Sequence, residues 1–297
     1  NGGEGDDVID ISGTQNPVAV IDGGEGIDTL KISSDTQWDN ISLTAVEILD
    51  GNGGYTQLSV QAILDKGITG AKNIEFRLDP YASGGTLDIT GLEGQVNLRG
   101  TDDSDSLIGN DQANRIYLNP EWNQSSYSNV TDNVSAGAGD DSIYRYLRSS
   151  DYNEQTNSYQ INGAIDGGDG ADTLTIIDND WRDDYYLDLT HLELTQIEHL
   201  QIGIESNVAS VHLSTEQLAA LSSVSTYSEY GNTYSMPAIG IIGGGAIDLA
   251  HINALGISNW FVADSLVYTI TGGDQQDTIA LGLGINNVYT YGGDDII

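Results

Sequence analysis

Gly-Gly-Glu-Gly-Asp-Asp-Val-Ile-Asp at residues 2–10 is the stretch that decides the fold, because its pattern of glycine, aspartate and apolar residues returns along the chain. The same pattern reads GGEGIDTLK at 23–31, GGDGADTLT at 167–175 and GGDQQDTIA at 272–280. The shared template is G-G-x-G-x-D-x-U-x, where U is a large apolar residue. A single match would be weak, whereas several matches in phase indicate a repeat architecture.

Each position of this nonapeptide has a physical role. Glycine permits the positive-φ backbone of a tight turn. Such a turn directs backbone carbonyl oxygens inward and the sixth-position Asp adds a carboxylate, so the turn offers the hard oxygen ligands that suit Ca²⁺. The eighth-position Ile, Leu or Val is expected to point inward and to build the core.

The nonapeptides occur in two blocks. Counting in nines from Gly100 reaches Tyr144 without a gap, and only the middle member, LNPEWNQSS at 118–126, is degenerate. Counting from Gly272 reaches Ile297, and joining Ile297 to Asn1 keeps the register into residues 2–10. The sixth positions of the two blocks are Asp105, Asn114, Asn123, Asp132 and Asp141, then Asp277, Asn286, Asp295, Asp7 and Asn16.

The chain also repeats itself on a larger scale. AVIDGG at 19–24 corresponds to GAIDGG at 163–168, and VEIL at 46–49 corresponds to IEHL at 197–200. Each half then ends in a block of nonapeptides. We therefore expect two diverged copies of one unit, and we expect residues 1–297 to be one period of a longer tandem array. The alternative is a lone domain whose ends match in register by coincidence.

These nonapeptides resemble the RTX (repeats-in-toxin, haemolysin-type) family of calcium-binding repeat proteins, in particular large surface adhesins, filaments and surface-layer proteins. The resemblance implies a parallel β-roll, Ca²⁺ as the cofactor, and a secreted protein on the bacterial cell surface or in the extracellular space. In this family two nonapeptides make one full coil, so a site lies between repeats n and n+2. The resemblance is specific for calcium β-rolls and leaves the function open, because toxins, proteases, lipases, epimerases and adhesins share it.

The resemblance assigns the calcium ligands. The expected carboxylate ligands are Asp7, Asp28, Asp105, Asp132, Asp141, Asp172, Asp277 and Asp295. The expected amide ligands are Asn16, Asn114, Asn123 and Asn286. The turn glycines expected to shape the sites are Gly3, Gly5, Gly24, Gly26, Gly137, Gly139, Gly168, Gly170, Gly273 and Gly293. Across the coils, Asp277 should face Asp295, Asn123 should face Asp141, and Asn114 should lie beside Asp132.

The predicted fold is all-β, a right-handed parallel β-solenoid that combines RTX β-roll blocks with wider β-helix coils and one or two short helices. The expected segments are β-roll blocks at 1–22, 100–144 and 272–297, wider coils at 23–99 and 167–271, and a Tyr-rich insertion at 145–166. Period-two alternation at 74–78 and 200–204 is typical of half-buried strands. Ser214 and Gln217 form a capping-box pattern that predicts a helix over 213–221, with a weaker counterpart at 58–64.

Composition excludes several functions. With 45 acidic and 9 basic residues the chain carries a formal charge of −36, so nucleic acid is not an expected partner. No apolar run is long enough to insert into a membrane, and cysteine is absent. The four histidines lack metal-ligand spacing and no catalytic constellation appears, so we do not expect an enzyme.

We therefore interpret the chain as a calcium-stabilised extracellular structural repeat of a large surface protein, such as a stalk, filament or surface layer. Its expected partners are copies of itself, end to end in a tandem array or polymer. Two alternatives stay open. One is the secretion and folding module of an RTX enzyme. The other is a glycan-binding adhesin segment, in which the Tyr-rich segments 144–159, 122–127 and 227–234 would contact a glycan or another cell-surface ligand.

Overall fold

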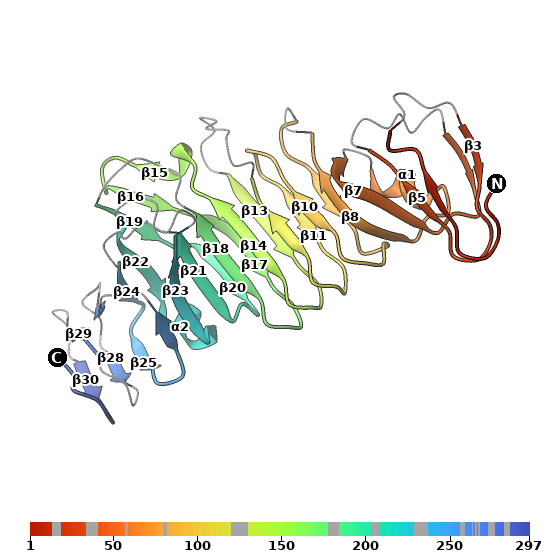
Figure 1. Ribbon diagram of the computed structural model, residues 1–297. Coiled ribbons are helices and arrows are strands. Elements are labelled where there is room, and N and C mark those ends of the chain that lie inside the picture. The colour runs from red at the N-terminus through yellow and green to blue at the C-terminus, as the bar shows by residue number, and fades with distance from the viewer. Residues whose placement is uncertain are drawn as a thin grey trace.

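A computed structural model shows a mostly β protein with many parallel sheets and few short helices. Figure 1 shows an elongated body whose N- and C-termini lie at opposite ends. The structure describes residues 1–13, 19–33, 41–56, 59–79, 82–119, 130–177, 184–203, 208–228, 237–255, 259–262, 264, 266, 268–272, 277–281 and 286–297.

The longest sheet runs along most of this body and is parallel throughout. Its eleven strands follow in the spatial order β2 (Val8–Asp10), β5 (Thr29–Lys31), β7 (Ile48–Thr56), β8 (Gly70–Arg77), β10 (Asn97–Arg99), β12 (Arg115–Tyr117), β14 (Ser142–Tyr146), β18 (Thr173–Ile177), β21 (His199–Gly203), β23 (Ser223–Tyr227) and β26 (Asn253–Leu255). Spatial order follows chain order, so each strand pairs with the strands supplied by the preceding and following segments of chain.

Two further sheets repeat this arrangement. The seven-stranded sheet comprises β15 (Tyr152–Asn153), β16 (Ser158–Gln160), β19 (Tyr185–Asp188), β22 (Val208–Ser214), β24 (Ala238–Ile242), β27 (Trp260–Val262) and β29 (Ile279–Ala280). The five-stranded sheet comprises β20 (Leu192–Thr195), β17 (Asn162–Asp166), β13 (Thr131–Ser135), β11 (Ser106–Ile108) and β9 (Thr86–Asp88). Within the described residues β15 and β16 form the only antiparallel pair.

Short elements complete the fold. The small parallel sheets are β25 (Gly245–Asp248) with β28 (Tyr268–Thr271) and β30 (Asn286–Tyr289), β3 (Ala19–Asp22) with β6 (Ile41–Thr44), and β1 (Gly3–Glu4) with β4 (Gly24–Glu25). The helical elements are α1 (Val60–Leu64), α2 (Thr215–Ala220) and the 3₁₀ turn η2 (Ser149–Asp151). None of the helices in the described part of the chain has the length and apolar character needed to cross a membrane.

The eighth position of the nonapeptides away from the chain ends builds the core, as predicted. Ile116, Ile143 and Leu174 occupy this position, lie in register on adjacent strands, and are completely buried. Full burial of such a side chain is worth about 1.5–3 kcal/mol. The resulting row of apolar side chains continues into Leu98 and Leu200, which lie outside the nonapeptides.

Both helix predictions are confirmed. At α2, Ser214 accepts a hydrogen bond from the backbone N–H of Gln217, and Gln217 accepts one from the backbone N–H of Ser214, which is the reciprocal capping box. At α1, Ser59 caps through the backbone N–H of Ala62. Each side chain satisfies a donor that the first helical turn would otherwise leave unpaired.

The Tyr-rich segment 145–166 departs from the expected insertion. It contributes β16 and β17 to two sheets, and Tyr159 is completely buried between Tyr152 and Tyr185. Tyr159 is therefore a core residue and not an exposed glycan contact. The segment 122–127 and most of 227–234 lie outside the described residues.

Candidate metal centres

The glycines assigned from the repeat form the expected turns. The described members all have positive φ, and they are Gly3, Gly5, Gly24, Gly26, Gly137, Gly139, Gly168, Gly170 and Gly293. Turns of successive strands stack directly, because the backbone N–H of Asp169 donates to the carbonyl of Gly137 at 3.0 Å and that of Gly139 donates to the carbonyl of Asp169 at 2.8 Å. Gly273 lies outside the described residues.

Substitutions of Gly168 and Gly3 allow the stability contributed by turn stacking to be measured apart from the cost of backbone strain. Both occupy the second position of a nonapeptide, with φ of 91° and 110°. A Cβ on Gly168 would overlap the carbonyl oxygen of Gly137, whereas a Cβ on Gly3 would meet nothing within 4 Å. We expect Gly3→Ala to cost about 1–2 kcal/mol from backbone strain alone. Gly168→Ala should cost about 1–3 kcal/mol more, because the neighbouring turn must move. Urea denaturation in Ca²⁺ measures both, and equal costs would contradict the stacking.

Sixth-position carboxylates form columns across adjacent strands. In the N-terminal column, the backbone N–H of Asp7 donates to Oδ1 of Asp28 at 2.8 Å, and that of Asp28 donates to Oε2 of Glu47 at 2.9 Å. In the central column, Asn114 donates to Asp141 at 2.6 Å, Asp141 to Asp172 at 2.7 Å, and Asp172 to Glu198 at 2.8 Å, each time from backbone N–H to side-chain oxygen. Each column lies where strands of the eleven-stranded sheet begin.

Glu47 and Glu198 are members of these columns that the repeat pattern misses. Each ends its column and lies two residues after a residue with positive φ, Ala45 at 48° and Gln196 at 49°. Their environments match further, because the backbone N–H of Glu47 donates to the carbonyl of Asp28 and that of Glu198 to the carbonyl of Asp172. The correspondence of 46–49 with 197–200 in the sequence is the signal that could have identified them.

The other oxygen of each Asp in these columns has no partner. Oδ2 of Asp7, Asp28, Asp141 and Asp172 is buried and accepts no hydrogen bond within the described residues. A Cβ on Gly167 would lie 2.6 Å from Oδ2 of Asp172 and would overlap the carbonyl oxygen of Gln196, so this glycine leaves room for two oxygens to approach. A buried, unpartnered carboxylate oxygen beside backbone carbonyls fits a Ca²⁺ ion.

The pKa values follow from the same geometry. Burial raises the pKa of Asp141 to about 7, and the nearby carboxylates of Asp172 and Asp140 add to this shift. Burial also raises the pKa of Asp172, and the carboxylate of Glu198 contributes. Stacked buried carboxylates therefore favour either protonation or a bound cation.

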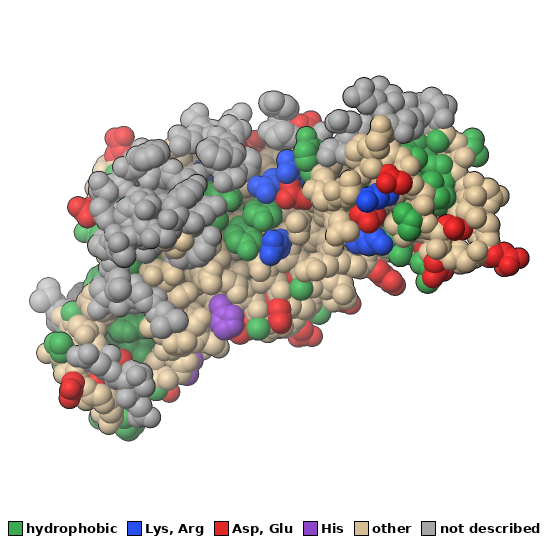
Figure 2. All heavy atoms as spheres, in the orientation of Figure 1, with side chains coloured by type: hydrophobic (Ala, Val, Ile, Leu, Met, Phe, Trp, Pro, Cys, Tyr) green, Lys and Arg blue, Asp and Glu red, His purple; other side chains and the backbone are tan. Residues whose placement is uncertain are grey.

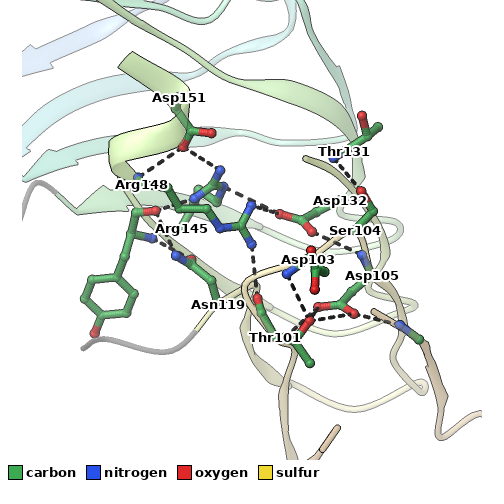
Figure 3. A network of polar contacts seen from close by, with 12 residues as sticks. Thr101, Asp103, Ser104, Asp105, Asn119, Thr131, Asp132, Arg145, Arg148 and Asp151 are labelled. Carbon is green, nitrogen blue, oxygen red and sulfur yellow. Dashed lines mark hydrogen bonds and ion pairs between the residues drawn. The ribbon is translucent and has the colours of Figure 1, made fainter. Parts of the chain in front are cut away.

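In a third column, where strands of the five-stranded sheet begin, the Asp132 carboxylate is paired with arginine (Figure 3). Asp132 accepts a hydrogen bond from the backbone N–H of Asp105 at 3.2 Å through Oδ1. Its Oδ2 lies 3.1 Å from Nη1 of Arg148 and 3.6 Å from Nε of Arg145. Both arginines are 1% exposed, and Nη2 of Arg145 also contacts Asp151 at 2.7 Å. We call Asp105, Asp132, Arg145 and Arg148 the arginine column.

The groups of the arginine column do not fit a metal ion at Asp105 and Asp132. Asp105 accepts from the backbone N–H groups of Gly85 and Thr101, and Arg148 also donates to the carbonyl of Thr101. Every carboxylate oxygen of Asp105 and Asp132 therefore already has a protein partner, in contrast to the unpartnered Oδ2 atoms of the central column. Burial raises the pKa of Asp132, and the charges of Arg148 and Arg145 oppose that shift.

The structure corrects one pairing and supports another. Asn114 pairs with Asp141 and not with Asp132, across a separation of 27 residues instead of two nonapeptides. The excess equals one nonapeptide, the length of the degenerate member at 118–126, which lacks the turn glycines and the apolar eighth residue. The side-chain oxygen of Asn114 accepts from the backbone N–H of Asn110, so this amide is already satisfied. Asp277 faces Asp295 as expected, at 3.0 Å from backbone nitrogen to Oδ1.

Of the three remaining expected ligands, the structure describes one. Asn286 lies at the first position of β30, and Asn16 and Asn123 lie outside the described residues. In the part of the chain that the structure describes, no three Asp, Glu, His or Cys side chains converge as a metal site. A Ca²⁺ ion at the columns would therefore depend on backbone carbonyls in addition to one or two carboxylates.

Comparison of the chain with protein-family models finds no match, and comparisons with curated proteins and with solved structures find none either. The assignment of a cation to the columns therefore depends on the residues and geometry described above.

Proposed function

We propose that the chain is a calcium-stabilised structural repeat of a large extracellular surface protein, and that its sheets are the faces of a right-handed parallel β-solenoid. The observation that carries this proposal is the pair of columns in which buried Asp oxygens lack partners beside stacked glycine turns. A cation there would satisfy these oxygens and relieve the repulsion between stacked carboxylates. The formal charge of −36 makes such counter-ions still more favourable.

In this proposal Ca²⁺ would be held by Asp7, Asp28, Asp141 and Asp172 with the carbonyls of their turns. The ion would supply positive charge and hard-cation coordination, and the chain would supply oxygens at stacked turns. Because the unfolded chain lacks these turns, binding free energy would contribute directly to folding.

The surface at the two ends supports association of copies end to end. Eleven large hydrophobic residues of the described part are exposed, and eight of them belong to the terminal segments. These eight are Val8, Val20, Ile27, Leu281, Tyr289, Tyr291, Ile296 and Ile297. Exposed apolar side chains beside open sheet edges are typical of surfaces that another copy covers.

A tandem fusion tests this role. We expect two copies joined directly, Ile297 to Asn1, to melt at a higher temperature than one copy, because the nonapeptide register continues through the junction and buries both end surfaces. The matched control carries four extra residues at the junction, which shift the register while keeping the copies tethered. Calorimetry in saturating Ca²⁺ measures the three melting temperatures.

The comparison between the fusion that keeps the nonapeptide register and the fusion that shifts it tests the proposal. A raised melting temperature in the direct fusion alone supports the end-to-end role. If the direct fusion melts like the single copy, the chain is a self-contained unit and the repeat proposal fails. The same holds if the fusion with the shifted register gains as much stability as the direct one.

A further inference from the structure

Basic residues are concentrated on one face of this acidic protein. Five of the nine Lys and Arg residues of the chain lie on β5, β8, β10 and β12 of the eleven-stranded sheet, and all but Lys72 belong to one group. With two tyrosines of the same face this group forms what we call the basic strip, which comprises Lys31, Arg77, Arg99, Arg115, Tyr55 and Tyr117. Figure 2 shows Lys and Arg side chains gathered over the middle of this face, with some acidic side chains among them and others toward the ends.

Guanidinium groups of the strip stack on its tyrosine rings. The guanidinium of Arg77 lies 3.9 Å from the ring centroid of Tyr55, and that of Arg99 lies 4.1 Å from that of Tyr117. Tyr117 stacks in turn on Tyr144 at 4.9 Å. Cation–π contacts of this kind restrict the guanidinium groups and leave their N–H edges available to a ligand.

The strip keeps positive charge that the protein does not neutralise. Arg77 and Arg99 share the carboxylate of Glu75, and Arg99 reaches both of its oxygens at 3.0 and 3.2 Å. Arg115 is exposed and, like Lys31, forms no ion pair with a described residue. Two arginines on one carboxylate leave a net positive charge, to which Arg115 and Lys31 add and from which Asp50, beside Lys31, subtracts.

A groove of about 660 Å³ opens beside these groups. Its lining includes Lys31, Arg77, Arg115 and Tyr55, together with the side-chain amides of Asn73 and Asn97. Amide groups supply both donors and acceptors for hydroxyl groups, while guanidinium and ammonium groups match a carboxylate. Tyr55 is 43% exposed and offers an aromatic surface for a ring to pack against.

We propose that this groove is a binding site for a short acidic saccharide, a sugar chain of a few units that bears carboxylates. The carboxylate would contact Arg115 and Lys31, the hydroxyls would contact the asparagines, and a sugar ring would pack on Tyr55. The groove lining shares no residue with the Tyr-rich segments or with the carboxylate columns.

The surroundings disfavour the other anionic partners. The strands under the strip are interior to the sheet, so an acidic peptide could not bind by adding a strand at an edge. A long polyanion such as nucleic acid would extend beyond the strip and meet a chain of net charge −36. A short ligand avoids this repulsion, because charges more than about 8 Å away are largely screened at physiological salt.

Titration calorimetry of the folded full chain tests the site with a galacturonic acid tetramer as the probe. The comparison ligands are the methyl ester of that tetramer, which lacks the charge, and tetraglutamate, which lacks the sugar. We expect Arg115→Gln to weaken binding of the tetramer about tenfold, because the variant loses a charge-assisted hydrogen bond to the carboxylate. Asp50→Asn removes a negative charge from the groove lining and should strengthen binding. Unchanged circular dichroism shows that both variants are folded.

The outcomes separate the candidates. Binding of the acid tetramer alone, weakened by Arg115→Gln and not by Asp50→Asn, supports the proposal. Equal binding of tetraglutamate means that the groove selects acidic peptides, and overturns it. No binding of any ligand overturns it as well. Tetramer binding that Arg115→Gln leaves unchanged places the ligand elsewhere, for instance on bound Ca²⁺, and also overturns it.

Discussion

Excess chelator is expected to abolish most of the β-sheet signal of the chain in far-ultraviolet circular dichroism, and added Ca²⁺ is expected to restore it. In the metal-free protein, Asp28, Asp141 and Asp172 keep buried oxygens without partners and lie in columns of like charge. Each ion that binds only the folded state contributes about 2.7 kcal/mol when its concentration is a hundred times its dissociation constant. Two such sites together contribute about 5 kcal/mol, which reaches the lower end of the stability of a typical domain, about 5–15 kcal/mol.

Magnesium is the matched control for this experiment. Mg²⁺ carries the same charge but requires a compact octahedral shell and gives up its waters reluctantly, so carbonyl-rich turns should hold it poorly. We therefore expect Mg²⁺ to restore little of the signal at concentrations where Ca²⁺ restores it fully. Identical spectra and melting temperatures in chelator and in Ca²⁺ would refute the calcium proposal.

Arg148→Met is expected to cost about 3–5 kcal/mol of the free energy of unfolding, measured by urea denaturation in Ca²⁺. The substitution leaves the buried carboxylate of Asp132 without its closest cation and removes a donor from the carbonyl of Thr101. Breaking one partner of a buried ion pair has a cost of this order, because the remaining charge is uncompensated.

Arg77→Met is the matched control, since Arg77 also pairs with a carboxylate but is 35% exposed. A pair of this exposure contributes about 0–1 kcal/mol. Adding Asp132→Asn to the Arg148→Met chain removes the uncompensated charge and should recover part of the loss. If Arg148→Met costs no more than Arg77→Met, the arginine column does not stabilise the fold as described.

The turns and the core row could be predicted from the sequence because they depend on local chemistry. Gly168 has positive φ and Ile143 is buried for reasons that each nonapeptide contains within itself. The same local logic gave the capping box of Ser214 and Gln217. Each of these features needs only a short window of residues and a period.

Which side chains pair across neighbouring strands was harder to predict, because the pairing depends on the length of chain between the strands. Counting in nines paired Asn114 with Asp132, whereas an additional nonapeptide length shifts its partner to Asp141. Arg148 reaches Asp132 from 16 residues further along the chain, in a segment without nonapeptides. No repeat pattern indicates that a guanidinium supplies the positive charge at one column while another column keeps unpartnered carboxylate oxygens.

The central claim is that cations bind the N-terminal and central columns and not the arginine column. An anomalous difference map from crystals of the chain grown in Ca²⁺ tests it most directly. We predict peaks within coordination distance, about 2.3–2.6 Å, of Oδ2 of Asp28, Asp141 and Asp172, and none at Asp132. A map without peaks at these three carboxylates, or with a peak at Asp132, would contradict the account.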